Sequence, residues 1–117
     1  MAYREDFTIN QGSDVAIQMY LVDEDDLPKN LLGYTLAAKL KPSFNADSDS
    51  TISFETSLGD DYSSGIATIL LTNLQTDTLT EPLYFYDVEL SFTDSSGETF
   101  IERILEGRIN ISKSITR

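Results

Sequence analysis

The stretch that decides the fold runs from Leu83 to Ser112 and reads LYFYDVELSFTDSSGETFIERILEGRINIS. In its first half, apolar residues recur at every second position and therefore share one face of an extended strand: Tyr84, Tyr86, Val88, Leu90 and Phe92. A two-residue period with many aromatic and β-branched side chains is typical of a strand with one buried face. We therefore expect a long strand here, followed by a partner strand that returns alongside it.

The second half of this stretch predicts the turn and the return strand. Residues 94–97, DSSG, supply an aspartate that can bond its own backbone and a glycine that tolerates positive φ. Gly107 interrupts the return strand, which predicts either a β-bulge or the close approach of another backbone segment. Arg103 is expected to form an exposed ion pair with Asp87 or Glu89 across the hairpin.

The rest of the chain predicts five shorter strands and one short helix. The strands are expected at residues 7–10, 15–22, 36–40, 52–54 and 65–71. A helix is expected near residues 72–79, capped by Thr72 or Asn73, with Leu74 and Leu79 pointing inward. About seven strands, with turn signals every ~8–12 residues, indicate an all-β antiparallel sandwich. We expect one domain over residues 1–117.

Composition narrows the chemistry of this chain. Its 117 residues include no cysteine and no histidine, which excludes disulfides, thiolate metal sites and the commonest general base. The net charge is −12, so nucleic acids and anionic membranes are disfavoured partners, and no apolar run approaches the ~20 residues of a membrane span. The acidity suits either solubility or a docking surface for a basic partner.

The densest run of carboxylates, residues 23–26, is the candidate metal site. Asp23, Asp25 and Asp26 are calcium candidates because calcium takes six to eight oxygen ligands. Adjacent side chains alone do not build that cage, and a solvated turn is the alternative. Weaker carboxylate pairs of the same kind are Asp47 with Asp49 and Asp60 with Asp61. We expect no cofactor.

The sequence predicts no enzyme. Two carboxylates can hydrolyse a glycoside, but 20 acidic residues in a small chain produce such pairs by chance. The four lysines stand in no recognisable motif that would activate a serine, and no phosphate-cradling glycine loop is present. The remaining candidates are partner contacts in the long loops, residues 23–34 and 42–64, and at the termini. We single out Tyr34, Phe44, Tyr62 and Arg117.

Several segments, in order, carry a family resemblance. They are Gln11-Gly12, LLGYT at 31–35, GIATI at 65–69, YFYDVEL at 84–90, the turn at 94–97, RILEGRINIS at 103–112 and Thr116-Arg117. This order is similar to that of small tailed-phage virion proteins and of the N-terminal domains of phage upper-baseplate and tail-fibre proteins. The resemblance covers nearly the whole chain. It implies an immunoglobulin-like β-sandwich that is built into a virion and performs no catalysis.

The resemblance implies a structural subunit of the tail or baseplate, or a fibre adaptor. Its partners would be other virion proteins of the baseplate, tail or capsid. The chain would be present in multiple symmetric copies in the virion, which is assembled in the host cytoplasm. A capsid decoration or head-fibre protein is one alternative, because an acidic surface suits outward display. A carbohydrate-binding adhesion module is another, although sugar binding favours aromatic platforms and the chain has no tryptophan.

Overall fold

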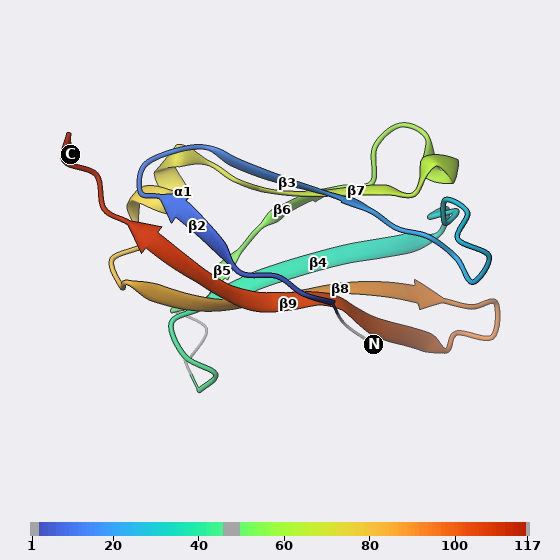
Figure 1. Ribbon diagram of the computed structural model, residues 1–117. Helices are drawn as coiled ribbons and strands as arrows, with labels where there is room; N and C mark the ends of the chain where they lie inside the picture. The colour runs from blue at the N-terminus through green and yellow to red at the C-terminus, as the bar shows by residue number, and fades with distance from the viewer. Residues whose placement is uncertain (1–2, 46–49, 117) are drawn as a thin grey trace.

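The computed structural model describes residues 3–45 and 50–116 and shows two β-sheets packed face to face (Figure 1). The strands are β1 (Tyr3–Arg4), β2 (Phe7–Asn10), β3 (Val15–Tyr20), β4 (Tyr34–Lys41), β5 (Ile52–Ser53), β6 (Glu55–Ser57), β7 (Ile66–Leu71), β8 (Leu83–Thr93) and β9 (Thr99–Ser112). A 3-10 helix, Tyr62–Ser64, precedes β7, and the helix α1 (Asn73–Asp77) follows it. The predicted all-β sandwich with one short helix is confirmed.

The two sheets differ in size. The larger has the order β5–β4–β8–β9, with β1 and β2 both paired to β9, and the smaller has the order β3–β7–β6. In chain order, β4–β8–β9 match strands C, F and G of an immunoglobulin sandwich, and β3–β7–β6 match B, E and D. The described N-terminal strands join β9 instead of β3, so the smaller sheet has three strands where an immunoglobulin constant-type sheet has four.

The core lies between the sheets and is built by alternating side chains. On β8, the predicted inward face is correct: Tyr84, Tyr86, Val88 and Leu90 are buried. They meet buried residues of β4 and β7, chiefly Leu36, Ala38, Leu40, Ala67, Ile69 and Leu71. Complete burial of a large apolar side chain stabilises a fold by roughly 1.5–3 kcal/mol, so these contacts between the sheets stabilise the sandwich.

The hairpin of β8 and β9 follows the predicted pattern and adds a bulge. Val88 pairs with Leu105 and Glu89 with Arg103, so Ile104 is the extra residue of β9. The predicted ion pair of Arg103 forms with Asp87, at 3.3 Å between Nε and Oδ2. Both side chains are about half exposed, so the pair contributes little to stability.

Two features of strand pairing differ from the prediction. The expected strand at 52–54 is two strands, because Ile52 pairs with Leu40 in the larger sheet while Glu55 pairs with Leu70 in the smaller one. Phe54 is buried at this crossing between the sheets. The second difference is that β1 and β2 run parallel to β9. Together, the split strand and β1 bring the described strands to nine.

Gly107 is the point where β9 is crossed by the segment between β1 and β2. A Cβ atom added there would overlap the Glu5 carbonyl oxygen and lie 2.9 Å from Asp6 Oδ1. Of the two predicted roles of Gly107, the structure therefore shows the close backbone approach, while the bulge lies at Ile104.

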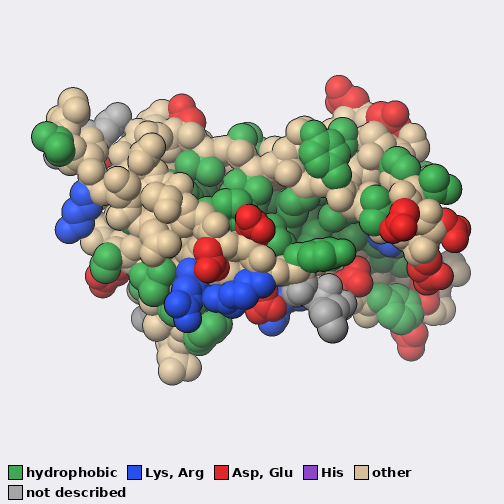
Figure 2. Space-filling model, viewed as in Figure 1, with side chains coloured by type: hydrophobic (Ala, Val, Ile, Leu, Met, Phe, Trp, Pro, Cys, Tyr) green, Lys and Arg blue, Asp and Glu red, His purple; other side chains and the backbone are tan. Residues whose placement is uncertain are grey.

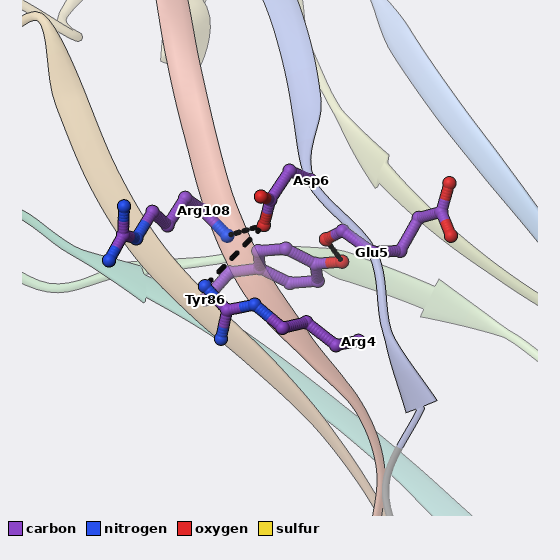
Figure 3. A network of polar contacts seen from close by, with 5 residues as sticks. All are labelled: Arg4, Glu5, Asp6, Tyr86 and Arg108. Carbon is purple, nitrogen blue, oxygen red and sulfur yellow. Dashed lines mark hydrogen bonds and ion pairs between the residues drawn. The ribbon is translucent and has the colours of Figure 1, made fainter.

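A network of polar contacts holds this crossing segment in place (Figure 3). The Tyr86 hydroxyl donates to the Glu5 carbonyl at 2.6 Å, and the Arg108 amide donates to Asp6 Oδ1 at 2.9 Å. Arg4 lies 3.7 Å from the same Asp6 oxygen. Burial, and then the nearby charges of Glu5 and Asp6, raise the pKa of Tyr86 above its ordinary value. The phenol therefore stays protonated and remains a donor.

The helix α1 begins with the predicted cap but faces differently. The Thr72 side chain accepts from the Gln75 amide and the Gln75 side chain accepts from the Thr72 amide, which completes a capping box. Leu79 is buried as predicted, but Leu74 is 77% exposed, so its predicted inward position is wrong. Thr76 is buried instead, because one short turn presents only one face to the core. No helix in the described ranges is long and apolar enough to cross a membrane.

Candidate functional site

The first candidate surface is an edge of the smaller sheet. No strand among the described residues pairs with the side of β3 that faces away from β7. The Leu21 amide donates to the Gly65 carbonyl beside β7, and backbone groups alternate in direction along an antiparallel strand. The backbone groups of Gln18 and Tyr20 therefore point to the open side.

This edge lacks the usual protection against pairing. Natural edge strands are short, or carry charged side chains or proline, because an exposed ladder otherwise invites another chain. With six residues, β3 is the longest strand that forms a sheet edge among the described residues, and its sequence VAIQMY contains neither a charge nor a proline. The chain as a whole is 24% charged, so an uncharged edge strand of this length differs from its average composition.

A cleft opens beside the second half of β3, and we call it the flank cleft. Its floor and walls are apolar and come from both sheets: Met19, Leu21, Leu90, Ile104 and Leu105. Figure 2 shows hydrophobic side chains in this hollow between the two layers. The cleft has a volume of about 620 Å³. The space beside β3 over the larger sheet is where the fourth strand of an immunoglobulin sheet would lie.

The rim of the flank cleft combines exposed apolar and acidic side chains. Tyr3 and Tyr20 stand at its mouth, 79% and 71% exposed. Asp23, Glu24 and Glu102 also line it, against a single cation, Lys29. An apolar cleft with exposed aromatic residues is typical of a protein-binding surface, and the acidic rim favours a basic segment.

The second candidate surface lies on the outer face of the larger sheet, and we call it the basic groove. Five of the chain's eight basic side chains line it: Arg4, Lys39, Lys41, Arg103 and Arg108. The strand register explains this gathering, because Lys41, Phe85 and Arg108 lie directly opposite one another on β4, β8 and β9. Figure 2 shows basic side chains collected along the lower part of the view, with acidic ones beside them.

Charge is unevenly compensated within the basic groove. The next row holds Asp87 and Glu106, and Arg103, one row further on, lies within 4 Å of both. Among the described residues no ion pair involves Lys41 or Arg108, and Arg108 lies 5.9 Å from the Phe85 ring centroid. The groove, of about 410 Å³, therefore carries its uncompensated positive charge around an aromatic ring.

The four predicted partner contacts do not come together. Phe44 is 80% exposed and stacks on Phe85 at the basic groove, with ring centroids 4.7 Å apart. Tyr34, at the other end of β4, is half-buried between the Phe92 ring and the Lys29 ammonium. Tyr62 is 43% exposed, and its carbonyl accepts from the Leu31 amide and so ties two loops together. Arg117 lies outside the described residues.

The predicted calcium ligands form a turn. Asp23 Oδ1 accepts from the amides of Asp25 and Leu27, at 2.9 and 3.1 Å, and Asp26 has a φ of 61°. Within residues 3–45 and 50–116, no three acidic side chains are grouped so that they would hold a metal ion. Asp61 instead caps the 3-10 helix, where bonds from Ser63 lower its pKa.

The weaker pair, Asp47 with Asp49, lies outside the described residues.

No family model matches this sequence, and the curated proteins contain no match to it either. What the chain binds must therefore be argued from its own surfaces. The sequence predicted Phe44 as a partner contact, but it indicated neither the basic side chains of Lys41 and Arg108 near it nor the open edge of β3. The absence of charged residues at 15–20 is a local signal of such an edge, and it was not used in the prediction.

Proposed function

We propose that this chain is a non-enzymatic structural subunit of a tailed-phage virion, placed in the tail or baseplate or as a fibre adaptor. The observation that carries the proposal is the unprotected edge of β3 beside the flank cleft, because an open strand edge next to an exposed apolar surface is typical of a protein-binding site. The order of motifs from Gln11 to Ser112 supports the phage assignment, since it is similar to that of small virion and baseplate proteins. The immunoglobulin-like order of strands agrees with that resemblance.

The test is to locate the chain in purified particles. Virions from the host that carries this gene are separated into heads and tails, and each fraction is probed with an antibody to the chain. An abundant host protein that does not belong to the virion serves as the control for contamination. Recovery with tails supports the proposal, recovery with heads favours the capsid-decoration alternative, and absence from both fractions overturns a virion role.

A second candidate function is supported by the basic groove. The Phe44 ring, which is 80% exposed, stacks on the half-buried Phe85 ring and forms an aromatic platform beside the cations of Lys41 and Arg108, which the sequence had not indicated. Aromatic faces with adjacent cations suit an anionic sugar, so the groove favours an adhesion module that binds acidic glycans.

The glycan function is tested by titrating the protein with neutral and uronic-acid oligosaccharides. Binding of the acidic sugars that is lost in Phe44→Ala, and retained in a control with another exposed apolar residue removed, Leu32→Ala, would establish it. Equal binding by both variants, or none by the wild type, would refute it.

A further inference from the structure

We infer that the flank cleft and the open edge of β3 bind residues 113–117 of a second copy of this chain, the segment that follows β9, as an added strand. The inference is independent of the virion role, because it concerns the purified protein. It depends on three observations: the form of the site, the chemistry of the segment, and the distance between them within one chain.

The site requires an extended segment. The backbone groups of Gln18 and Tyr20 form the open side of a hydrogen-bonding ladder, and adding a strand to such an edge is an established mode of peptide binding. The neighbouring space is bounded below by Ile104 and Leu105 of β9 and by Tyr3 of β1. One strand that lies there would pair with β3 and would cover this apolar floor with every second side chain.

The C-terminal segment has the matching chemistry. Residues 113–116 leave β9 and lie outside the sheet, and Figure 1 shows them projecting from the end of the sandwich. Ile115 is fully exposed, at 102%, which exceeds every other exposed large apolar side chain among the described residues. Lys113 and Arg117 are two positions away on either side, so in an extended segment all three side chains share one face.

Charge complementarity favours this segment as the occupant. The cleft is apolar in the middle, and its acidic residues, Asp23, Glu24 and Glu102, outnumber its single cation. The segment is apolar at Ile115 and basic on both sides. In a chain of net charge −12, a short basic and apolar segment is uncommon, and most other exposed loops would add acid to an acidic rim.

The segment does not reach the cleft of its own chain. Leu105 is the residue of the cleft nearest to Ser112 along β9, and seven residues of extended strand, about 23 Å, separate it from this last residue of the strand. Residues 113–116 extend over only about 14 Å, and Figure 1 shows them leaving the end of the sandwich opposite the turn between β8 and β9. The occupant must therefore come from another molecule. The contact joins two different surfaces, and it would produce rings or open chains of copies.

The experiment has two parts and uses the full chain. Sedimentation velocity over a concentration series measures self-association of the wild type, of Ile115→Ser and of Leu74→Ser. Leu74 is a matched control, because it is also an exposed apolar residue but lies on α1 outside the cleft. We expect association in the wild type and in Leu74→Ser, and a monomer in Ile115→Ser at the same concentrations.

The second part uses a labelled peptide with the sequence ISKSITR, residues 111–117. We expect saturable binding to the wild type, loss of binding in Gln18→Pro, which removes an open-side amide, and roughly threefold to tenfold weaker binding in Glu24→Lys/Glu102→Lys. The peptide ISESITE should in turn prefer that charge-reversed protein. Because Gln18→Pro can unfold the chain, the charge reversal provides the second variant, and thermal unfolding verifies the fold of both.

Several results would overturn the inference. A wild type that remains monomeric and does not bind the peptide excludes this occupant. Association that persists in Ile115→Ser, or peptide binding that is indifferent to the exchange of charge, places the contact elsewhere on the molecule.

Discussion

Replacing Gly107 with alanine tests how the N-terminal strands are attached. The added Cβ would overlap the Glu5 carbonyl oxygen and would lie 2.8 Å from the Glu5 carbonyl carbon. These are backbone atoms, so the crossing segment must lift away from β9. The shift would break three hydrogen bonds: Tyr86 to Glu5 at 2.6 Å, Arg108 to Asp6 at 2.9 Å, and Glu5 to Glu106 at 2.9 Å.

The loss of stability expected for Gly107→Ala follows from these three hydrogen bonds. Each contributes about 1 kcal/mol, while alanine recovers up to about 1 kcal/mol by restricting the unfolded chain, which leaves a net loss of about 2–3 kcal/mol. For a domain of this size the melting temperature should fall by roughly 8–12 °C. Urea unfolding measures the free energy of unfolding directly. In Gly107→Ala, the amide hydrogens of residues 5–10 should also exchange faster than in the wild type.

A second glycine separates this steric effect from backbone strain. Gly97 has a φ of +89° but nothing within 4 Å of an added Cβ, so Gly97→Ala should cost only about 1 kcal/mol, through its left-handed conformation. If Gly107→Ala is no less stable than the wild type, or loses less than Gly97→Ala, the close approach of the crossing segment is not what requires glycine at this position.

Three further predictions concern single side chains. Tyr86→Phe should lower the free energy of unfolding by about 1 kcal/mol, because it removes the hydrogen bond to Glu5. Since the folded state raises the pKa of Tyr86, the stability that the phenol contributes is complete below pH ~10 and declines as the pH rises above it. Urea midpoints of the two proteins that stay parallel from pH 7 to 11 would contradict this prediction. Thr72→Ala removes the cap of α1 and should cost about 1 kcal/mol in the same assay, and an unchanged midpoint would show that the capping box contributes nothing. Ser96→Ala removes the hydrogen bond that contributes most to lowering the pKa of Asp94, so an NMR titration should find that pKa raised toward its ordinary value. The stability that this carboxylate contributes is present at neutral pH and is lost as the pH falls through the folded-state pKa. An Asp94 titration identical to that of the wild type would refute the assignment.

The long hairpin was predictable because its evidence is local. The period of Tyr84, Tyr86, Val88 and Leu90 determines which face is buried, and the turn at 94–97 determines where the chain reverses. Neither feature depends on distant residues. The same is true of the capping box at Thr72, where the residues that bond one another are three positions apart.

The missed features depend on pairings between distant residues. Alternation continues through residues 52–57 whether they form one strand or two, so the pattern does not reveal that Phe54 marks a crossing between sheets. The parallel pairing of Phe7 with Ile109 joins residues that are 102 positions apart, and no local signal specifies it. The open edge of β3 is a consequence of that pairing, because the first strands join β9 instead.

The basic groove illustrates the same limit. Lys41, Phe85 and Arg108 are far apart in the sequence and become neighbours only through the register of β4, β8 and β9. Phe44 was predicted as a partner contact because its loop is exposed, and the structure places it on Phe85 at this groove. Exposure was predictable from the sequence, whereas the chemistry of the surroundings was not.

Amide hydrogen exchange at Gln18 and Tyr20 tests the central claim, that the open edge of β3 is a binding surface. The account predicts rapid exchange of both amides in dilute protein and at least tenfold slower exchange when the protein is concentrated or saturated with the 111–117 peptide. The Met19 amide, which faces β7, should exchange slowly under every condition and serves as the control. Protection of Gln18 and Tyr20 already in dilute protein, or exchange that neither concentration nor peptide changes, would contradict the account.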